Sequence, residues 1–232
     1  MIERRPFASL GRVDNWGVMA RHHFSFADYY DPKRVNWGVL RAWNDDEITP
    51  YTGFSPHSHT NVDIITYVRE GAITHRDTNG NVGRTEAGDV HVLCAGSGVR
   101  HTEYNHESEA AKMFQIWIAP TRAGGDPASG TTFFPREDRS GRLTVLANGI
   151  ANDDEALPLR ADARVLGATL KAGDSLEYAI GENRHGYLVP ATGAIAVNGV
   201  RIEARDGAAI ANTETVTITA LNNAEIILVD AA

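Results

Sequence analysis

The chain is a succession of short runs of β-branched and aromatic residues, interrupted every few positions by Gly, Asn, Asp or Pro. Such runs predict β-strands, because branched and aromatic side chains suit a pleated, half-buried backbone, while the interrupting residues favour turns. Long helical periodicity is scarce. The sequence therefore predicts an antiparallel, all-β fold, with strands over residues 35–44, 63–69, 90–94, 113–118, 143–147, 164–170, 187–189, 194–197, 216–220 and 225–229.

This strand pattern occurs twice. A tyrosine, a Gly-Ala-Ile run, an Asn-Gly pair and a later glycine recur in the same order 119 to 122 positions apart, at 67, 71–73, 79–80 and 88 and then at 187, 193–195, 198–199 and 207. The Asn-Gly pairs predict type I′ hairpin turns, which need positive φ at both central residues. Residues 119–142 are rich in Gly and Pro, which is typical of a connection. We therefore expect one unit over residues 1–130, and a second unit, preceded by the linker, over residues 131–232.

Two short motifs of the first copy, His57-Ser58-His59 and His101-Thr102-Glu103, carry the side chains best suited to chemistry. Residues two apart on a strand point to the same face, so each motif can deliver two ligands to one side of a sheet. Three imidazoles and a carboxylate suit one divalent transition metal. Fe, Mn, Co, Ni, Cu and Zn all accept such a set, and of these we favour Fe(II). The alternative is four polar surface residues on unrelated strands.

The second copy lacks these ligands. Shifting the two motifs by the local repeat offset predicts Glu177, Ala179, Ala220 and Asn222 at the equivalent positions. We therefore expect the second unit to have no metal site.

Charge and hydropathy exclude several partners. The net charge of −8 argues against direct binding to nucleic acid or to an anionic membrane, which needs clustered Lys and Arg. No stretch approaches the roughly 18 apolar residues of a membrane span, and the start of the chain has no secretory pattern, so we expect a cytoplasmic protein. The single cysteine, Cys94, lies in a strand-like run and is predicted to be a buried, inert thiol. We also expect a monomer, because closed barrels leave few long strand edges.

The first half resembles the pirin family. Residues 53–59 with 65–71 are similar to the first cupin motif in its pirin form, and residues 95–105 to the second. Further matches lie at residues 23–32 and 114–118. The resemblance implies two cupin (jelly-roll) barrels in tandem, the second degenerate, with a metal in the first. The ligands that it implies are His57, His59, His101 and Glu103.

The resemblance also implies an activity: metal-dependent quercetin 2,3-dioxygenase, which cleaves a flavonol with O₂ and releases CO. The expected partners are then a small flavonol-like aromatic substrate and O₂. Glu103 is the candidate catalytic base for the flavonol hydroxyl, or else only a fourth ligand. Two other functions stay open. One is a pirin-like metal-binding regulatory protein that acts through a protein partner without catalysis, and the other is a scaffold that the metal merely stabilises.

Strand parity suggests what surrounds the metal. Gln115 and Asp63 are predicted to accept hydrogen bonds from the outer ring nitrogens of the ligating histidines. Four aromatic residues are predicted either to line an apolar substrate pocket or to belong to the core: Phe24, Phe26, Phe54 and Trp117.

Overall fold

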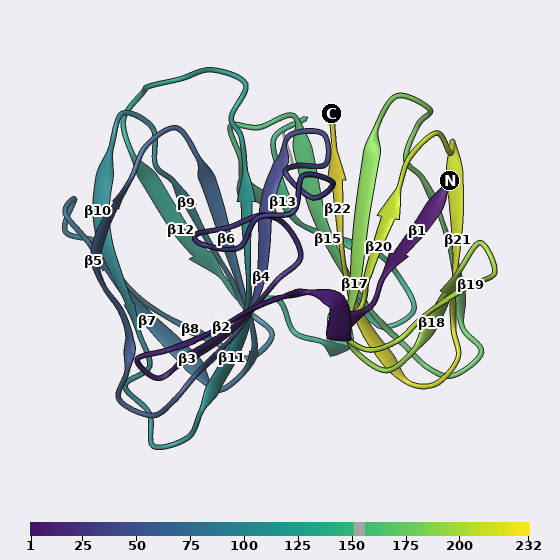
Figure 1. Ribbon diagram of the computed structural model, residues 1–232, viewed down its shortest axis with the longest axis horizontal. Coiled ribbons are helices and arrows are strands. Elements are labelled where there is room, and N and C mark those ends of the chain that lie inside the picture. Colours follow the sequence, from purple (N-terminus) through teal and green to yellow (C-terminus); the bar gives the residue numbers. More distant parts are fainter. Residues whose placement is uncertain (151–155) are drawn as a thin grey trace.

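The computed structural model describes residues 1–150 and 156–232, and nearly all of its regular structure is β-strand (Figure 1). The N-terminal half holds a seven-stranded sheet in the order β12 (Ala128–Thr132), β9 (Val90–Cys94), β6 (Asp63–Glu70), β11 (Ala111–Ile118), β4 (Leu40–Ile48), β3 (Val18–His22) and β2 (Gly11–Asn15). Its second sheet has four strands, β5 (Gly53–His59), β10 (Val99–Tyr104), β7 (Ala72–Asp77) and β8 (Val82–Glu86).

The C-terminal half repeats this plan. Its seven-stranded sheet runs in the order β1 (Ile2–Arg5), β20 (Gly207–Ile210), β17 (His185–Thr192), β22 (Ala224–Ala231), β15 (Ala163–Leu170), β13 (Thr144–Asn148) and β14 (Leu157–Pro158). The four-stranded sheet contains β16 (Ser175–Ala179), β21 (Thr215–Ala220), β18 (Ile195–Val197) and β19 (Val200–Ile202). The only helices in the described ranges are two 3₁₀ turns, η1 (Phe7–Ser9) and η2 (Glu137–Arg139). The all-β prediction is confirmed, and neither of these helices has the length and hydrophobicity that a membrane span needs.

The ten predicted strands all overlap observed ones. The first begins later than expected, at Leu40, and ends later, at Ile48. The strands that the residue pattern missed include β5 and β10, which carry the two histidine motifs. Both are rich in polar residues, because one face of each looks into a polar interior.

The Asn-Gly turns differ from each other. Asn198 and Gly199 have φ of 46° and 82° and join β18 to β19 directly, so the type I′ prediction is confirmed there. At the first site only Gly80 has positive φ, and four residues separate β7 from β8, so the prediction is wrong there. The Asp77 carboxylate accepts hydrogen bonds from the backbone N–H of Asn79 and of Asn81, and these bonds shape the longer loop.

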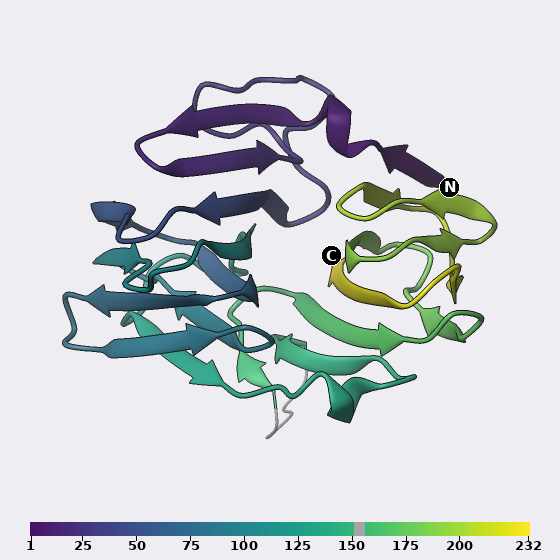
Figure 2. The same cartoon turned by 90° about the horizontal axis from the view of Figure 1, so that it is seen from below.

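The two halves lie side by side with their seven-stranded sheets facing each other (Figures 1 and 2). The largest hydrophobic cluster lies between these sheets and combines β6, β9, β11 and β4 with β15, β17, β20 and β22. On β6, Ile65 and Tyr67 belong to this shared cluster, whereas Ile64 and Val68 belong to clusters confined to the N-terminal half. β6 is thus buried on both faces, which explains why apolar residues occupy both of them.

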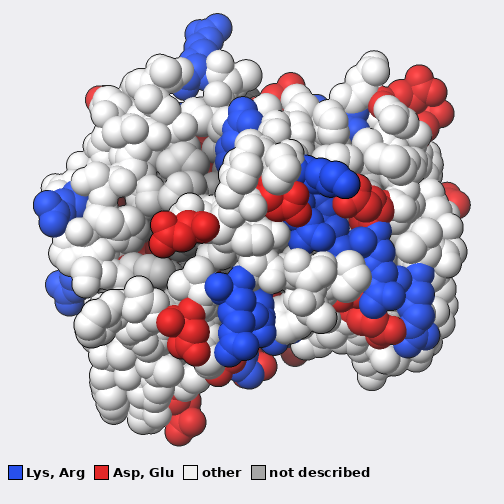
Figure 3. Space-filling model, viewed as in Figure 1, with Lys and Arg blue, Asp and Glu red and all other residues white. Residues whose placement is uncertain are grey.

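Each half is a sandwich of two separate sheets that hydrogen bonds do not close into a barrel. The N-terminal strand crosses between the halves: Ile2 to Arg5 pair antiparallel with β20 of the C-terminal half. Charged side chains gather over β1 in Figure 3, and some of them form ion pairs that bind β1 and its neighbours, such as Arg4 with Asp206 at 2.7 Å. The division of the chain at residue 130 stays a prediction. β1 precedes that residue in the sequence but pairs with a strand of the C-terminal half.

Candidate metal centre and pocket

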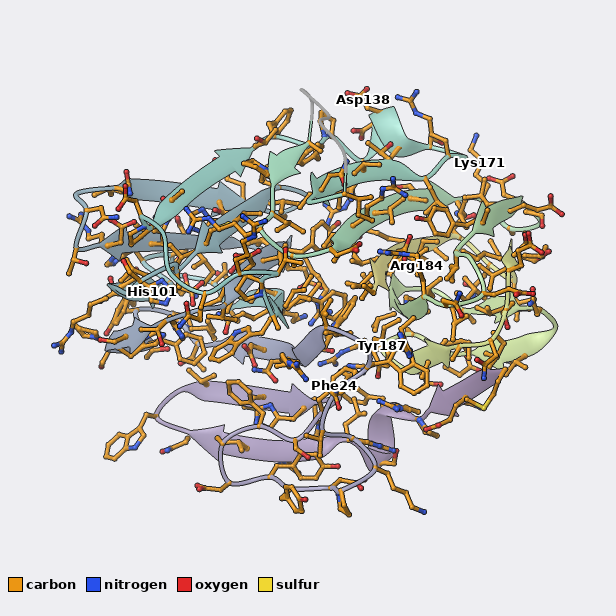
Figure 4. All side chains as sticks on the ribbon, turned by 90° about the horizontal axis from the view of Figure 1, so that it is seen from above. Phe24, His101, Asp138, Lys171, Arg184 and Tyr187 are labelled. Carbon is orange, nitrogen blue, oxygen red and sulfur yellow. The ribbon has the colours of Figure 1, made fainter. Side chains whose placement is uncertain are left out.

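Three histidines converge on the four-stranded sheet of the N-terminal half. β5 and β10 are antiparallel neighbours, with His57 directly opposite His101. His59 lies two residues further along β5 and therefore on the same face. One ring nitrogen from each of the three lies within 4.8 Å of the others, and His57 Nε2 and His101 Nε2 are 3.0 Å apart. The side chain of His101 can be followed in the interior of this half in Figure 4.

The protonation state of these histidines suits the binding of a metal cation. Burial, reinforced by the neighbouring histidines, lowers the pKa of both His59 and His101 to about 4. These rings are therefore neutral at neutral pH, the form that binds a metal. His57 Nδ1 lies 2.8 Å from the backbone carbonyl of Ser55, so it can donate its proton there and leave the Nε2 lone pair facing His101. The three residues could hold one divalent transition metal.

Glu103 lies beside the histidine cluster but outside that 4.8 Å group. Its side chain is 2% exposed, and both carboxylate oxygens accept hydrogen bonds, one from Thr66 Oγ1 at 3.0 Å and the other from Gln115 Nε2 at 2.6 Å. Burial raises the pKa of Glu103, and the bonds from Thr66 and Gln115 oppose that rise. The carboxylate is thus held by two donors within reach of the site.

The predicted outer hydrogen-bond acceptors are wrong. Asp63 instead accepts a hydrogen bond from the backbone N–H of Arg160. Gln115 donates to Glu103, and its own oxygen accepts from Trp117 Nε1 at 3.0 Å. The acceptor near His57 is a backbone carbonyl, a partner that carries no signature in the residue pattern.

A pocket of about 480 Å³ opens beside His57 and His59. Its size suits a drug-sized ligand. Phe26, Phe54 and Trp117 line it, as one of the two predicted alternatives had it. Phe24 does not; it is fully buried against Tyr187 at the junction of the halves (Figure 4). Rings also pack on each other around the site, with the Trp117 ring at 4.9 Å from both Phe26 and His59, edge to face.

The sequence reasoning missed three polar residues that line this pocket, His22, Asn44 and Asp46. His22 Nδ1 and Asn44 Oδ1 are 2.8 Å apart, and burial lowers the pKa of His22. Burial and the like charges of Asp45 and Glu103 raise the pKa of Asp46 well above its usual range. The available signal was the polar Asn-Asp-Asp run inside an otherwise apolar strand, since polar residues on a buried strand need partners or a cavity.

The strand register corrects which residues replace the ligands in the C-terminal half. Glu103 lies opposite His75, whereas Ile218 lies opposite Val197, which corresponds to His75 in the repeat. Ile218 therefore takes the position of Glu103, and Val216, two residues earlier, takes that of His101. Between the last repeated glycine, Gly88 in the first copy and Gly207 in the second, and this strand, the second copy has four fewer residues. The offset of 119 therefore predicted the wrong counterparts, Ala220 and Asn222, for His101 and Glu103.

The same register identifies the counterparts of the two β5 histidines. Tyr178 lies opposite Val216, as His57 lies opposite His101. Ile180, two residues on, corresponds to His59. Ile180, Val216 and Ile218 belong to the core cluster of the C-terminal half, and Tyr178 packs against it. The equivalent interior is thus filled with apolar side chains, and the histidine cluster is the only such group of metal-ligating residues within 1–150 and 156–232.

Two repeated jelly-roll units, one with a three-histidine cluster and one with an apolar interior, define the chain as a bicupin. It belongs to the pirin family: the family model described as Pirin matches residues 4–118, and the model of the quercetinase C-terminal cupin domain matches residues 149–231.

Individual relatives agree over the whole chain. The sequence is 60% identical over 232 residues to a pirin-like protein of Caulobacter vibrioides, covering 100% of both chains. It is 34% identical over 227 residues to the quercetin 2,3-dioxygenase of Escherichia coli K12, covering 97% of this chain and 94% of that one. The crystal structure of YhhW from Escherichia coli superposes with a TM-score of 0.95 at 31% identity over 100% of this chain and 98% of that one. A second structure of YhhW, in complex with nickel(II), gives 0.93 at 31% identity over 100% and 99%.

Proposed function

We propose that the protein is a metal-dependent dioxygenase that cleaves flavonols such as quercetin, with O₂ as co-substrate and release of CO. The observation that carries this proposal is the position of the histidine cluster, which faces an aromatic-walled pocket of about 480 Å³. A planar bicyclic ligand could place its hydroxyl at the histidines and its rings between the aromatic walls. The names of the relatives at 34% identity and of the nickel-bound structure support both the substrate class and the metal.

The chain's own residues have distinct tasks in this reaction. His57, His59 and His101 would hold the metal, and Glu103 would be the fourth ligand. A metal bound there would supply Lewis acidity, which would make the flavonol hydroxyl more acidic. Glu103 would accept that proton, since each of its oxygens accepts a single hydrogen bond, from Thr66 or from Gln115, and keeps a second lone pair. Phe26, Phe54 and Trp117 exclude water from the ring that is cleaved.

Reconstitution tests the proposal. The metal-free protein is loaded without oxygen with each divalent metal in turn, with Fe(II) as the favoured ion, and then given quercetin and O₂. We expect loss of the flavonol absorbance together with CO, and at least a 100-fold loss of rate in His57→Ala. The exposed His106 offers a matched control, and His106→Ala should behave as the wild type.

The alternative outcome is equally definite. Tight metal binding without turnover under any ion would reject the dioxygenase and favour the pirin-like regulatory protein that acts through a protein partner. We further propose a cytoplasmic location, a monomeric state and no direct binding to nucleic acid. The net charge of −8 supports only the last of these.

A further inference from the structure

Trp16 has a conformation that the fold does not explain. Its side chain is 89% exposed, although an indole is among the side chains that gain most from burial. Its φ is 51°, in the left-handed region that bulky residues rarely adopt. With Gly17 at φ 82° it forms the two-residue turn between β2 and β3, where Asn would be the favoured residue. Both features are unfavourable, and neither is offset by packing within the chain.

The position of this turn points to a ligand. Trp16 lines the same pocket as His57, Phe54 and Trp117. Other residues of the β2–β3 hairpin, Val13 and Val18, line it as well, so the hairpin forms one wall. At the equivalent edge of the C-terminal half there is only β13 and the two-residue strand β14. The hairpin thus accompanies the half that has the histidines.

The turn is fixed while its indole is free. The carbonyl oxygen of Gly17 accepts hydrogen bonds from the backbone N–H of Thr49 at 2.9 Å, from Thr49 Oγ1 at 3.1 Å and from Thr52 Oγ1 at 3.3 Å. A Cβ at position 17 would meet Thr49 Oγ1 at 2.6 Å, so glycine is required for this close approach. The backbone is therefore held at the rim of the pocket, and the exposed side chain is left to rotate.

We propose that Trp16 is a positioning residue that closes over a planar aromatic ligand in this pocket and stacks on the ring that remains outside the histidine site. The class of ligand rests on the proposed function. Stacking on an indole gives a flat aromatic molecule affinity and orientation without a specific hydrogen bond, which suits the polyphenolic ring system of a flavonol.

Binding measured without turnover tests this role. Metal-loaded protein is titrated with quercetin under strict exclusion of O₂ for the wild type, Trp16→Ala and Trp16→Phe, with Phe133→Ala as control. Phe133 is also an exposed aromatic residue, at 71%, but lines a different pocket. We expect Kd to rise about 3- to 10-fold in Trp16→Ala, as loss of one aromatic pair predicts. Trp16→Phe should recover most of the affinity, and Phe133→Ala should not change it.

Admitting O₂ then separates this role from the proposed reaction. If quercetin is cleaved, Trp16→Ala should raise KM by the same factor with kcat nearly unchanged, since on this proposal the indole stacks on the ring that is outside the histidine site. Binding without cleavage in the wild type would reject the dioxygenase, while the Kd ratio would still support Trp16. Equal Kd in Trp16→Ala and wild type, or no quercetin binding at all, would overturn the role of Trp16.

Discussion

At the scale of single residues, Asp46 is a buried carboxyl group in the wall of the pocket. The residue is 2% exposed, and both burial and the neighbouring carboxylates Asp45 and Glu103 disfavour its charged form, while Arg69 favours it. A folded-state pKa above the unfolded one means that folding favours the protonated carboxyl. The contribution of Asp46 to stability is therefore complete at acid pH and is lost as the pH rises from about the usual aspartate pKa through the raised one.

The metal-free Asp46→Asn variant should for this reason be more stable than the wild type at pH 7, by about 1 kcal/mol or more, because the amide has no ionisation to suppress. The difference should shrink towards pH 4. Urea unfolding at several pH values measures it, with the exposed Asp14→Asn as control. A difference that grew on acidification would show that Asp46 is ionised in the folded protein.

At the scale of strands and turns, the sequence predicted what depends on local pattern. Strands buried on both faces, such as β6 and β9, have apolar residues on both faces and were found directly. β10 has neither an apolar run nor a clean alternation, and only the spacing of His101 and Glu103 marked it. The counterparts of His101 and Glu103 were misplaced by four residues and those of His57 and His59 by one, because differences in segment length shift the register without leaving a local signal. The Ser55 carbonyl oxygen could not be predicted as the acceptor for His57, because every residue has a backbone carbonyl.

Two glycines of the second repeat allow the cost of a left-handed backbone to be measured apart from the cost of a steric collision. Both have positive φ, 73° at Gly193 and 82° at Gly199. A Cβ at Gly199 would meet nothing within 4 Å, whereas one at Gly193 would collide with the backbone oxygen of Asn223. Gly199→Ala should therefore cost only about 1 kcal/mol of stability, from the left-handed backbone, and Gly193→Ala about 3 kcal/mol or more. Thermal unfolding of both variants measures this, and equal losses would contradict the collision.

At the scale of the whole molecule, a buried ionic cluster joins the two halves. Glu225 on β22 accepts hydrogen bonds from Tyr67 on β6, from Arg136 Nε at 2.9 Å and from Arg139 Nη2 at 3.2 Å. The Arg139 side chain is 1% exposed, so its charge has little access to water. The cluster fixes the contact of the two seven-stranded sheets beside their shared apolar core.

Glu225→Ala should destabilise the protein by about 3 kcal/mol or more, because it leaves the buried Arg139 guanidinium without its counter-ion. The matched control is Glu70→Ala, which removes an exposed partner of Lys112 and should cost less than about 1 kcal/mol. Denaturant unfolding compares the two. Similar small losses would mean that the cluster does not hold the halves together.

The pairing of β1 with β20 has a consequence for biosynthesis. Ile2 lies opposite Ile210, so β1 finds its partner only after some two hundred further residues have been made. At a typical rate of about 5–20 residues per second, this delay lasts on the order of 10–40 s. During that time an unpaired strand edge is exposed to other nascent chains, and the C-terminal sheet gains its edge strand from a segment that was made long before the rest of it.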